Sequence, residues 1–321
     1  MEKFLQCQSC GMTFDERHKQ YIAKDKDGND SIYCTYCYRD GEFIDPRATM
    51  ADMIELAVPH FTHKTGDEEA ARKYMTEVVS SLSRWRTNEK IVKIALIHGQ
   101  NHKGSTYHIA RMTAEKIGGS TEEFYPEEFS EGCLGCYACI NKGMTFCPHY
   151  DRIGPVLASM LSSDVIVIGS PTYVLEMTGQ LKCFFDHLFS AWLSHRPEKS
   201  MFSKIAVVVS TAAGIGMNGV TKSIARQLFY LGVPKIYRMP VRVASMSWDM
   251  VQRKEQISAK AHKIARKVAD QNGKAKPGLR LRFMFSMMRL MHKKNDWAPL
   301  DKRYWKDMGW LEKGRPWKSH E

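Results

Sequence analysis

Eight of the nine cysteines in this 321-residue chain fall into two compact sets, which constrain the fold more than any other feature. The first set is two C-x2-C pairs separated by 23 residues. Such pairs are typical of a structural zinc site, because Zn²⁺ prefers a closed tetrahedron of thiolates. A metal-free, redox-active thiol set is the alternative. The sequence predicts a zinc ribbon whose ligands are Cys7, Cys10, Cys34 and Cys37.

The second set follows the spacing C-x2-C-x2-C-x7-C within fifteen residues. Three thiolates two residues apart form one concave face of a loop, and a fourth can close it. Such a loop can hold an iron–sulfur cluster, whose ligands are usually four cysteine thiolates. A structural loop without iron is the alternative. The predicted cluster ligands, for a [4Fe–4S] group, are Cys133, Cys136, Cys139 and Cys147.

The surrounding sequence favours a reducing, cytoplasmic protein. No apolar signal segment precedes Cys7, and no run of about 18 apolar residues appears, so no transmembrane segment is predicted. A disulfide framework would suit a short secreted chain instead.

The net charge of +12 is confined to the end of the chain. Residues 251–321 contain 19 Lys and Arg and 7 Asp and Glu, whereas the preceding 250 residues balance to zero. We therefore do not expect a nucleic-acid partner for the body, and an acidic partner would meet the tail.

The order of apolar runs predicts four regions. From residue 91 onward, four apolar strands alternate with helices, which implies an α/β domain with a parallel sheet covered on both faces. Before it, a pair of helices is expected, with the first ending at Pro59. The expected regions are a zinc ribbon at 1–47, a helical pair and linker at 48–90, an α/β domain at 91–250, and a basic helix and tail at 251–321.

Three strand exits could form a ligand site. The first carries Gly99-x4-Gly104 at a helix start, which offers backbone N–H groups to a phosphate. Ser105 stands where a P-loop has lysine, so an NTPase is not predicted. The second exit, 169–173, could contact the edge of a flavin, and the third, 210–216, could bound its other side. The alternative for each is an ordinary structural turn.

The block at 169–186, together with the loop at 99–106, resembles the NADPH-dependent FMN reductase group of the flavodoxin-like fold. The cysteine loop lies between these motifs, as in the iron–sulfur flavoproteins of that group, and residues 1–86 resemble a zinc ribbon domain. Departures are Gln100 for a usual Ser, His102 for a frequent Arg, and Tyr150-Asp151 for a common Asp-Asp pair.

The resemblance implies a doubly wound five-stranded parallel sheet, FMN as cofactor, NAD(P)H as co-substrate, and a dimer or tetramer. It implies phosphate binding at the first loop and ring binding near 171–174. No catalytic acid or base is named. The residues expected to hold FMN are Gly99, Gln100, Lys103, Gly104, Ser105, Thr106, Pro171, Thr172, Tyr173, Val174, Thr211 and Gly214.

The predicted function is an FMN-dependent oxidoreductase that transfers electrons between NAD(P)H, or a ferredoxin-type donor, and an acceptor. The acceptor is a small molecule or an electron-carrier protein, and the cluster would relay single electrons. One alternative is a flavin-only NAD(P)H:quinone or nitro-compound reductase. Another is a zinc-ribbon interaction protein that senses metal or redox state and carries a degenerate flavodoxin-like scaffold.

The tail contains one more predicted element, a basic amphipathic helix over 279–291. We expect Arg282, Ser286, Arg289 and Lys293 to share one side of it. Packing of its Met-rich face on the body or across a dimer is favoured over binding to a membrane surface or a partner. The tryptophans that follow suggest that the tail wraps onto the body.

Overall fold

The computed structural model describes residues 5–46, 48–85, 91–245, 247–294 and 296–318. The chain divides into two compact units, residues 1–90 and residues 91–321, each considered by itself below. None of the described helices is both long and apolar enough to cross a bilayer.

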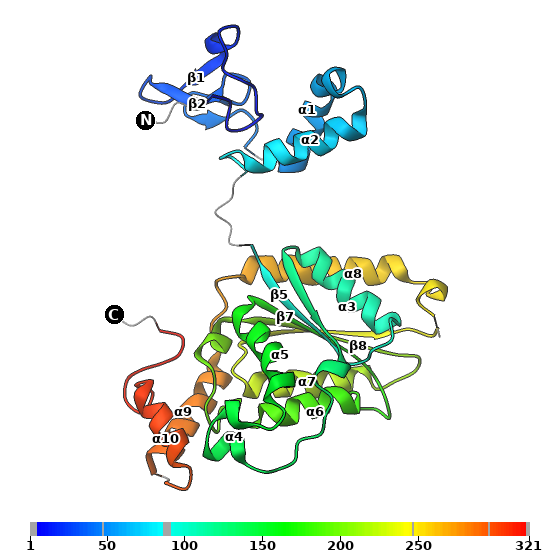
Figure 1. The fold of residues 1–321 in the computed structure, drawn as a ribbon, viewed down its shortest axis with the longest axis vertical. Helices are drawn as coiled ribbons and strands as arrows, with labels where there is room; N and C mark the ends of the chain where they lie inside the picture. The colour runs from blue at the N-terminus through cyan, green and yellow to red at the C-terminus, as the bar shows by residue number, and fades with distance from the viewer. Residues whose placement is uncertain (1–4, 47, 86–90, 246, 295, 319–321) are drawn as a thin grey trace. The chain divides into compact units, whose positions relative to one another are not determined.

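The first unit joins a small β ribbon to two helices (Figure 1). Strands β1 (Ile22–Lys24) and β2 (Asp30–Cys34) pair antiparallel, as do β3 (Tyr38–Arg39) and β4 (Glu42–Phe43). Helices α1 (Met50–Thr65) and α2 (Glu68–Ser81) follow. Three of the zinc-type cysteines are buried in one core with apolar residues of both helices, so the ribbon and the helical pair fold as one body.

Helix α1 differs from the sequence expectation, because it continues through Pro59 to Thr65. Proline removes one helical N–H, and the carbonyl that it leaves without a donor belongs to Glu55, one turn earlier. Both residues are exposed, so water can satisfy that carbonyl and the helix need not stop. Thr49 caps its start in a capping box with Asp52.

The second unit is built on a five-stranded parallel sheet in the order β6-β5-β7-β8-β9. In chain order this is 2-1-3-4-5, the flavodoxin-like arrangement, and it confirms the predicted fold. The three central strands are almost entirely buried, because their apolar runs face helices on both sides. The strands are β5 (Lys93–His98), β6 (Ser120–Phe124), β7 (Val165–Pro171), β8 (Ile205–Ala212) and β9 (Lys235–Arg242).

Edge strand β6 has no counterpart among the four strands predicted from apolar runs. Its sequence is Ser-Thr-Glu-Glu-Phe, and only Phe124 is buried. It pairs with β5 from Lys93↔Ser120 to Ile97↔Phe124. An edge strand needs one buried anchor and backbone pairing, so its polar sequence carries little strand signal.

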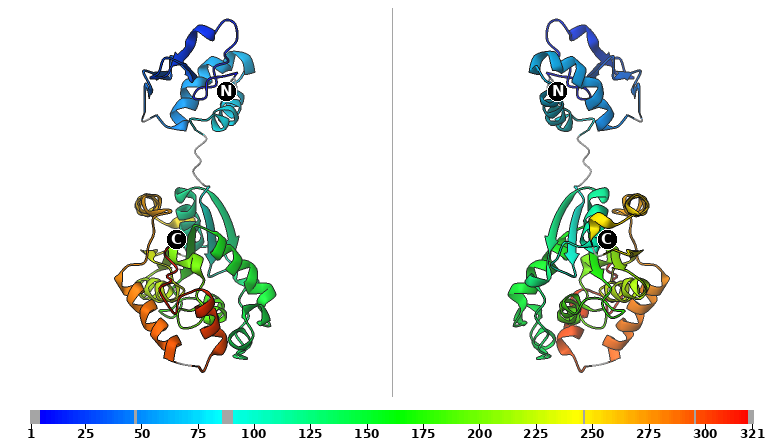
Figure 2. Two further views of the ribbon diagram at one scale, coloured as in Figure 1. Left: turned by 90° about the vertical axis from the view of Figure 1, so that its left-hand side faces the viewer. Right: turned by 90° about the vertical axis from the view of Figure 1, so that its right-hand side faces the viewer.

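Helices cover both faces of this sheet (Figures 1 and 2). Helices α3 (Ser105–Ile117) and α8 (Lys254–Gln271) share one apolar core with it. On the other face lie α5 (Tyr150–Ser162), α6 (Gly179–His187) and α7 (Met217–Tyr230). The short α4 (Ala138–Asn141) lies within the cysteine loop. Helix α8 lies within the region expected as basic helix and tail, and it is part of the α/β layer.

The tail folds onto the body through α9 (Leu279–Lys294) and α10 (Pro299–Asp307). Its buried cluster joins Leu281, Phe285, Trp305 and Trp310 to Phe202 of the body. Packing of the tail is therefore confirmed. The predicted polar side of α9 is wrong at Arg289, which is buried and donates from Nε to the Trp310 carbonyl at 2.6 Å.

Candidate cofactor and metal sites

The predicted flavin-binding residues lie at the carboxyl ends of β5, β7 and β8, which are neighbours in the sheet. Side-chain hydrogen bonds join the three strand exits. Thr106 Oγ1 lies 2.6 Å from Thr211 Oγ1, and Gln100 Nε2 donates to the Tyr173 hydroxyl at 3.0 Å. Thr172 Oγ1 lies 3.1 Å from Ser210 Oγ. The topology thus brings together segments about a hundred residues apart.

The first exit presents a helix start without a side-chain cap. Gly104 is the N-cap of α3 and has no side chain to cap it, and no hydrogen bond from a described side chain reaches the amides of the first turn. The first intrahelical bond runs from the His108 N–H to the Gly104 carbonyl at 3.1 Å. The preceding amides of Ser105, Thr106 and Tyr107 therefore have no intrahelical acceptor, and they suit an anion such as a phosphate.

Two glycines allow this loop to close. A Cβ on Gly99 would lie 3.0 Å from the Gly169 carbonyl oxygen and 3.0 Å from Thr178 Oγ1. A Cβ on Gly104 would lie 2.6 Å from Cε1 of His102. The imidazole of His102 therefore lies over the helix start, where the related family often has arginine.

The second exit contains a tight turn with two apolar central residues. Tyr173 and Glu176 exchange backbone hydrogen bonds of 2.9 and 3.0 Å. Between them, Val174 and Leu175 have φ of 49° and 65°, as a type I′ turn requires. Such positions favour Gly or Asn, and a β-branched residue there is strained. Val174 is 98% exposed, so this turn presents strained apolar surface to solvent.

The third exit packs closely against the second. Gly216 has φ of 101°, and a Cβ there would lie 2.7 Å from Thr172 Cγ2 and 3.0 Å from Leu175 Cδ2. The Thr172 N–H donates to the Thr211 carbonyl at 2.9 Å. Gly214 is exposed, with no atom within 4 Å of the position a Cβ would take. The loop therefore leaves open space at Gly214.

One buried histidine sits at the base of the first loop. His98 Nε2 lies 3.0 Å from Glu123 Oε2, and its ring stacks on Tyr125 with centroids 4.8 Å apart. Burial lowers the pKa of His98, although the Glu123 carboxylate acts in the opposite direction. The ring is 2% exposed, so it supports the loop and is poorly placed for proton transfer with solvent.

The four cysteines of the first unit form a compact sulfur tetrad. Their Sγ atoms all lie within 4.8 Å of one another. Cys10 Sγ and Cys34 Sγ are 3.7 Å apart, close to the edge of about 3.8 Å expected for a tetrahedron with Zn–S bonds of about 2.3 Å. The Cys34 N–H also donates to Cys7 Sγ at 3.2 Å, which favours the thiolate. These residues fit Zn²⁺.

The second cysteine set lines one pocket, shared with His149 and His187. The sulfur atoms of this second set are too far apart to surround one metal ion. Among the described residues, only the first tetrad has ligand atoms close enough for that. A multi-iron cluster is wider than one ion, so a wider cysteine cradle fits that group better. Cys147 Sγ lies 3.8 Å from His187 Nδ1, whose Nε2 lies 2.7 Å from the Glu131 carbonyl oxygen.

An arginine ties the cysteine loop to the tail. Arg196 donates to the backbone carbonyls of Cys139 and Ile140 and to the carboxylate of Asp301. Asp301 is completely buried and also bonds His195 Nδ1 at 2.7 Å. Helix α10 therefore fixes the position of the Cys139 segment through one guanidinium group.

Comparison with known proteins agrees with this architecture. Residues 92–244 match the family model for NADPH-dependent FMN reductase. The match takes in all five strands of the parallel sheet, so the body is similar to NADPH-dependent FMN reductases over its whole sheet. Residues 6–86 of the first unit match the model described as "Putative zinc ribbon domain". The reductase match supports FMN as the cofactor, and the ribbon match with the sulfur tetrad supports Zn²⁺.

Relatives of the reductase domain fall in two groups. An iron–sulfur flavoprotein of Archaeoglobus fulgidus is 35% identical over 30% of this chain and 48% of that protein. An FMN-dependent NADH:quinone oxidoreductase 2 of Pseudomonas aeruginosa is 26% identical over 62% of this chain and 92% of that protein. The Trp repressor binding protein of Bacillus subtilis aligns with a TM-score of 0.39 at 21% identity, over 53% of this chain and 97% of that one.

The chain spans less than half the length of the iron–sulfur flavoproteins that it matches. The individual roles of the twelve predicted flavin contacts and of the four loop cysteines stay predictions. His98, His102, Tyr107 and Gly169 also line the pocket at the first exit and were not among the predicted contacts. Gly169 could have been found from its place at the end of the second apolar run, whereas Tyr107 carries no local signal.

Proposed function

We propose that this protein is an FMN-dependent oxidoreductase that passes electrons from NAD(P)H or a ferredoxin-type donor to an acceptor. The observation that carries the proposal is the meeting, at three adjacent strand ends, of an uncapped helix start and a strained apolar turn. The helix start suits the phosphate of FMN, and the turn suits one face of its ring.

FMN, when bound, supplies acceptance of a hydride and release of single electrons. The chain's own residues bind and orient it. The first-turn amides of α3 would hold the phosphate, and His102 would cover it. Tyr173, fixed by its bond to Gln100, and the turn at Val174 would set the position of the ring. No side chain is assigned proton transfer.

The loop cysteines would hold a [4Fe–4S] cluster that exchanges single electrons with an outside carrier. The pocket that they share supports this, as does the likeness to proteins named iron–sulfur flavoproteins. Arg196 would hold the Cys139 segment in place from outside the pocket.

A flavin-only NAD(P)H:quinone reductase is the second candidate. It is favoured by the match to a protein named FMN-dependent NADH:quinone oxidoreductase, which this chain covers over 92% of its length. In that case the cysteine loop is structural and the activity needs no iron. We further propose a cytoplasmic homo-oligomer, since the resemblance to FMN reductases favours a dimer or tetramer and two metal-type cysteine sets favour a reducing compartment.

The test is anaerobic purification of the full chain, followed by measurement of acid-released FMN, iron, sulfide and zinc per chain. One FMN per chain, bleached by NAD(P)H or by a reduced ferredoxin, is the expected result. A protein that stays colourless after incubation with FMN would refute the flavin proposal. Cys136→Ser separates the two candidates: loss of iron together with loss of acceptor reduction supports the cluster, and unchanged turnover without iron supports the flavin-only enzyme.

A further inference from the structure

Helix α9 presents an apolar stripe to solvent, opposite the face that it buries. Leu281 and Phe285 pack inward against Trp305 and Trp310 of the tail. On the other side, the apolar residues at spacings of i, i+4, i+8 and i+11 share one face. These are Leu279, Phe283, Met287 and Leu290, with exposed fractions of 86%, 70%, 41% and 56%.

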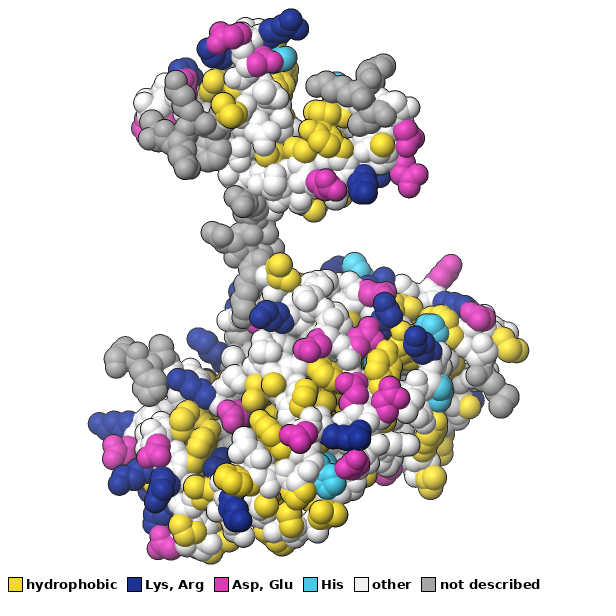
Figure 3. Space-filling view, viewed as in Figure 1, with side chains coloured by type: hydrophobic (Ala, Val, Ile, Leu, Met, Phe, Trp, Pro, Cys, Tyr) yellow, Lys and Arg dark blue, Asp and Glu magenta, His cyan; other side chains and the backbone are white. Residues whose placement is uncertain are grey.

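Cationic side chains flank this stripe on both sides. At 3.6 residues per turn, Arg282 and Lys293 lie along one border and Arg280 lies along the other, while Lys294 ends the stripe at the last residue of the helix. Arg280 is held over the ring of Phe229 at 4.9 Å, which fixes that border. In Figure 3, Lys and Arg side chains gather among apolar ones in the part of the body where Figure 1 draws the C-terminal helices.

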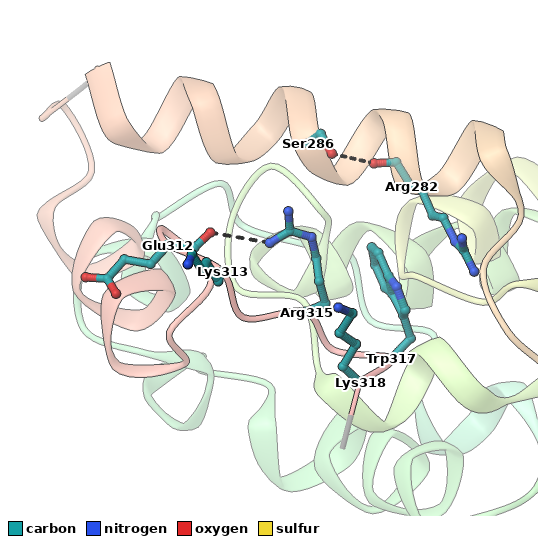
Figure 4. A pocket seen from close by; sticks show the side chains of 7 residues that line it. All are labelled: Arg282, Ser286, Glu312, Lys313, Arg315, Trp317 and Lys318. Atoms are coloured by element: carbon teal, nitrogen blue, oxygen red, sulfur yellow. Dashed lines mark hydrogen bonds between the residues drawn. The ribbon is translucent and has the colours of Figure 1, made fainter. Parts of the chain in front are cut away.

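A basic pocket of about 440 Å³ opens beside the first border. Arg282 and Ser286 of α9 form one wall, and Arg315, Trp317 and Lys318 form the other (Figure 4). Within the described part of the chain, Arg282, Arg315 and Lys318 form no ion pair with a carboxylate. Glu312 also lines the pocket, but Figure 4 shows its carboxylate directed away from Arg315 and Trp317.

We propose that this face of α9 docks on an anionic phospholipid bilayer, with the basic pocket receiving a phosphate headgroup. An apolar stripe bordered by Lys and Arg is the pattern of a helix that lies in the membrane interface. The stripe would enter the acyl boundary while the flanking cations meet the headgroups. The excess of +12 in residues 251–321 adds attraction to a negative surface.

Charge and apolar exposure together favour an anionic bilayer over a second copy of the chain and over nucleic acid. A second copy of the chain meeting this face in a two-fold dimer would place the same cations opposite each other. Nucleic acid would satisfy the cations but would leave the exposed Leu279 and Phe283 in water. An anionic bilayer is complementary to both features.

The experiment is sedimentation of the full-length holoprotein with vesicles. Phosphatidylglycerol mixed with phosphatidylcholine is compared with phosphatidylcholine alone. We expect binding to the anionic vesicles only, and weaker binding as salt is raised from about 0.1 M to about 0.5 M. Equal binding to both compositions, or no binding to either, would overturn the proposal.

Two paired variants make the test specific. Phe283→Ser with Leu290→Ser is expected to lower vesicle binding at least about tenfold, since it removes apolar surface from the stripe. Arg282→Gln with Lys318→Gln should lower it by a similar factor. The controls are Leu56→Ser, an exposed leucine of the first unit, and Lys263→Gln on α8.

All four replaced side chains are exposed, so we expect each variant to fold. Unchanged FMN content and an unchanged circular dichroism spectrum verify this. Binding by the serine pair at the level of the controls would contradict the proposal. So would a loss of oligomer mass in the serine pair without vesicles, since that result assigns the face to a second copy of the chain. Neither readout depends on electron transfer, so failure here leaves the proposed redox function untouched.

Discussion

His195 and Asp301 form a buried hydrogen bond of 2.7 Å between Nδ1 and Oδ2, although they lie 106 positions apart in the chain. The same carboxylate bonds Arg196, whose guanidinium group also holds the carbonyls of Cys139 and Ile140. One aspartate of the tail therefore supports the loop that carries the predicted cluster ligands.

Replacing Asp301 with Ala should destabilise the body by about 3–5 kcal/mol, because it leaves a mostly buried Arg196 without its counter-charge. Urea unfolding at neutral pH measures this loss. The matched control is Lys302→Gln on the same helix. It breaks the exposed pair with Asp296, 2.6 Å in length, and should cost less than about 1 kcal/mol. Equal effects of the two variants would contradict a structural role for the buried pair.

Removing one zinc ligand should unfold the first unit and spare the second. We expect Cys37→Ser to lose zinc and the cooperative melting of residues 1–90, since metal ligation supplies much of the folding free energy of so small a ribbon. FMN content should not change. Zinc analysis and calorimetry test this, with Cys183→Ser as the control. A first unit that melts normally without zinc would show that the four cysteines act without metal.

Adding a side chain at Gly104 in the first loop should weaken flavin binding. Gly104→Ala places a Cβ 2.6 Å from Cε1 of His102 and displaces that ring from the helix start. We expect the dissociation constant for FMN to rise by about tenfold or more, measured by quenching of flavin fluorescence. Gly278→Ala is the control, because no atom lies within 4 Å of its added Cβ. A dissociation constant for FMN in Gly104→Ala equal to that of the wild type would show that the phosphate binds elsewhere.

Acid should destabilise the body through buried histidines. Burial lowers the pKa of His292, with Asp301 opposing the shift and His195 reinforcing it, and burial also lowers the pKa of His98. In the unfolded chain both histidines have the ordinary pKa of about 6.5. As pH falls below that value, the unfolded state binds more protons than the folded state, so stability decreases.

The urea midpoint should therefore fall between about pH 7.5 and pH 5.5, because this range spans the ordinary histidine pKa. The fall should be smaller in His292→Phe, which removes one of the two groups. The comparison uses the slope with pH and not the absolute stability, since the substitution also changes packing against Trp305. An unchanged slope would mean that His292 does not contribute.

Much of the fold could be predicted because its signals are local. The central strands are buried on both faces, so each is one apolar run, and the paired C-x2-C spacing of the first cysteine set predicts the sulfur tetrad. Strand β6 and the helix through Pro59 could not be predicted in this way. Strand β6 forms because its backbone pairs with β5, and the helix continues through Pro59 because that side of α1 faces water.

The sequence by itself determined the two cysteine sets, the alternation of strands and helices, and the confinement of charge to the tail. Only the tertiary structure decided that Arg289 turns inward while Phe283 stays in water, and that Arg196 connects Cys139 to Asp301. The reason is physical. Which side of an amphipathic helix is buried, and which charges are paired, depends on surfaces supplied by distant parts of the chain.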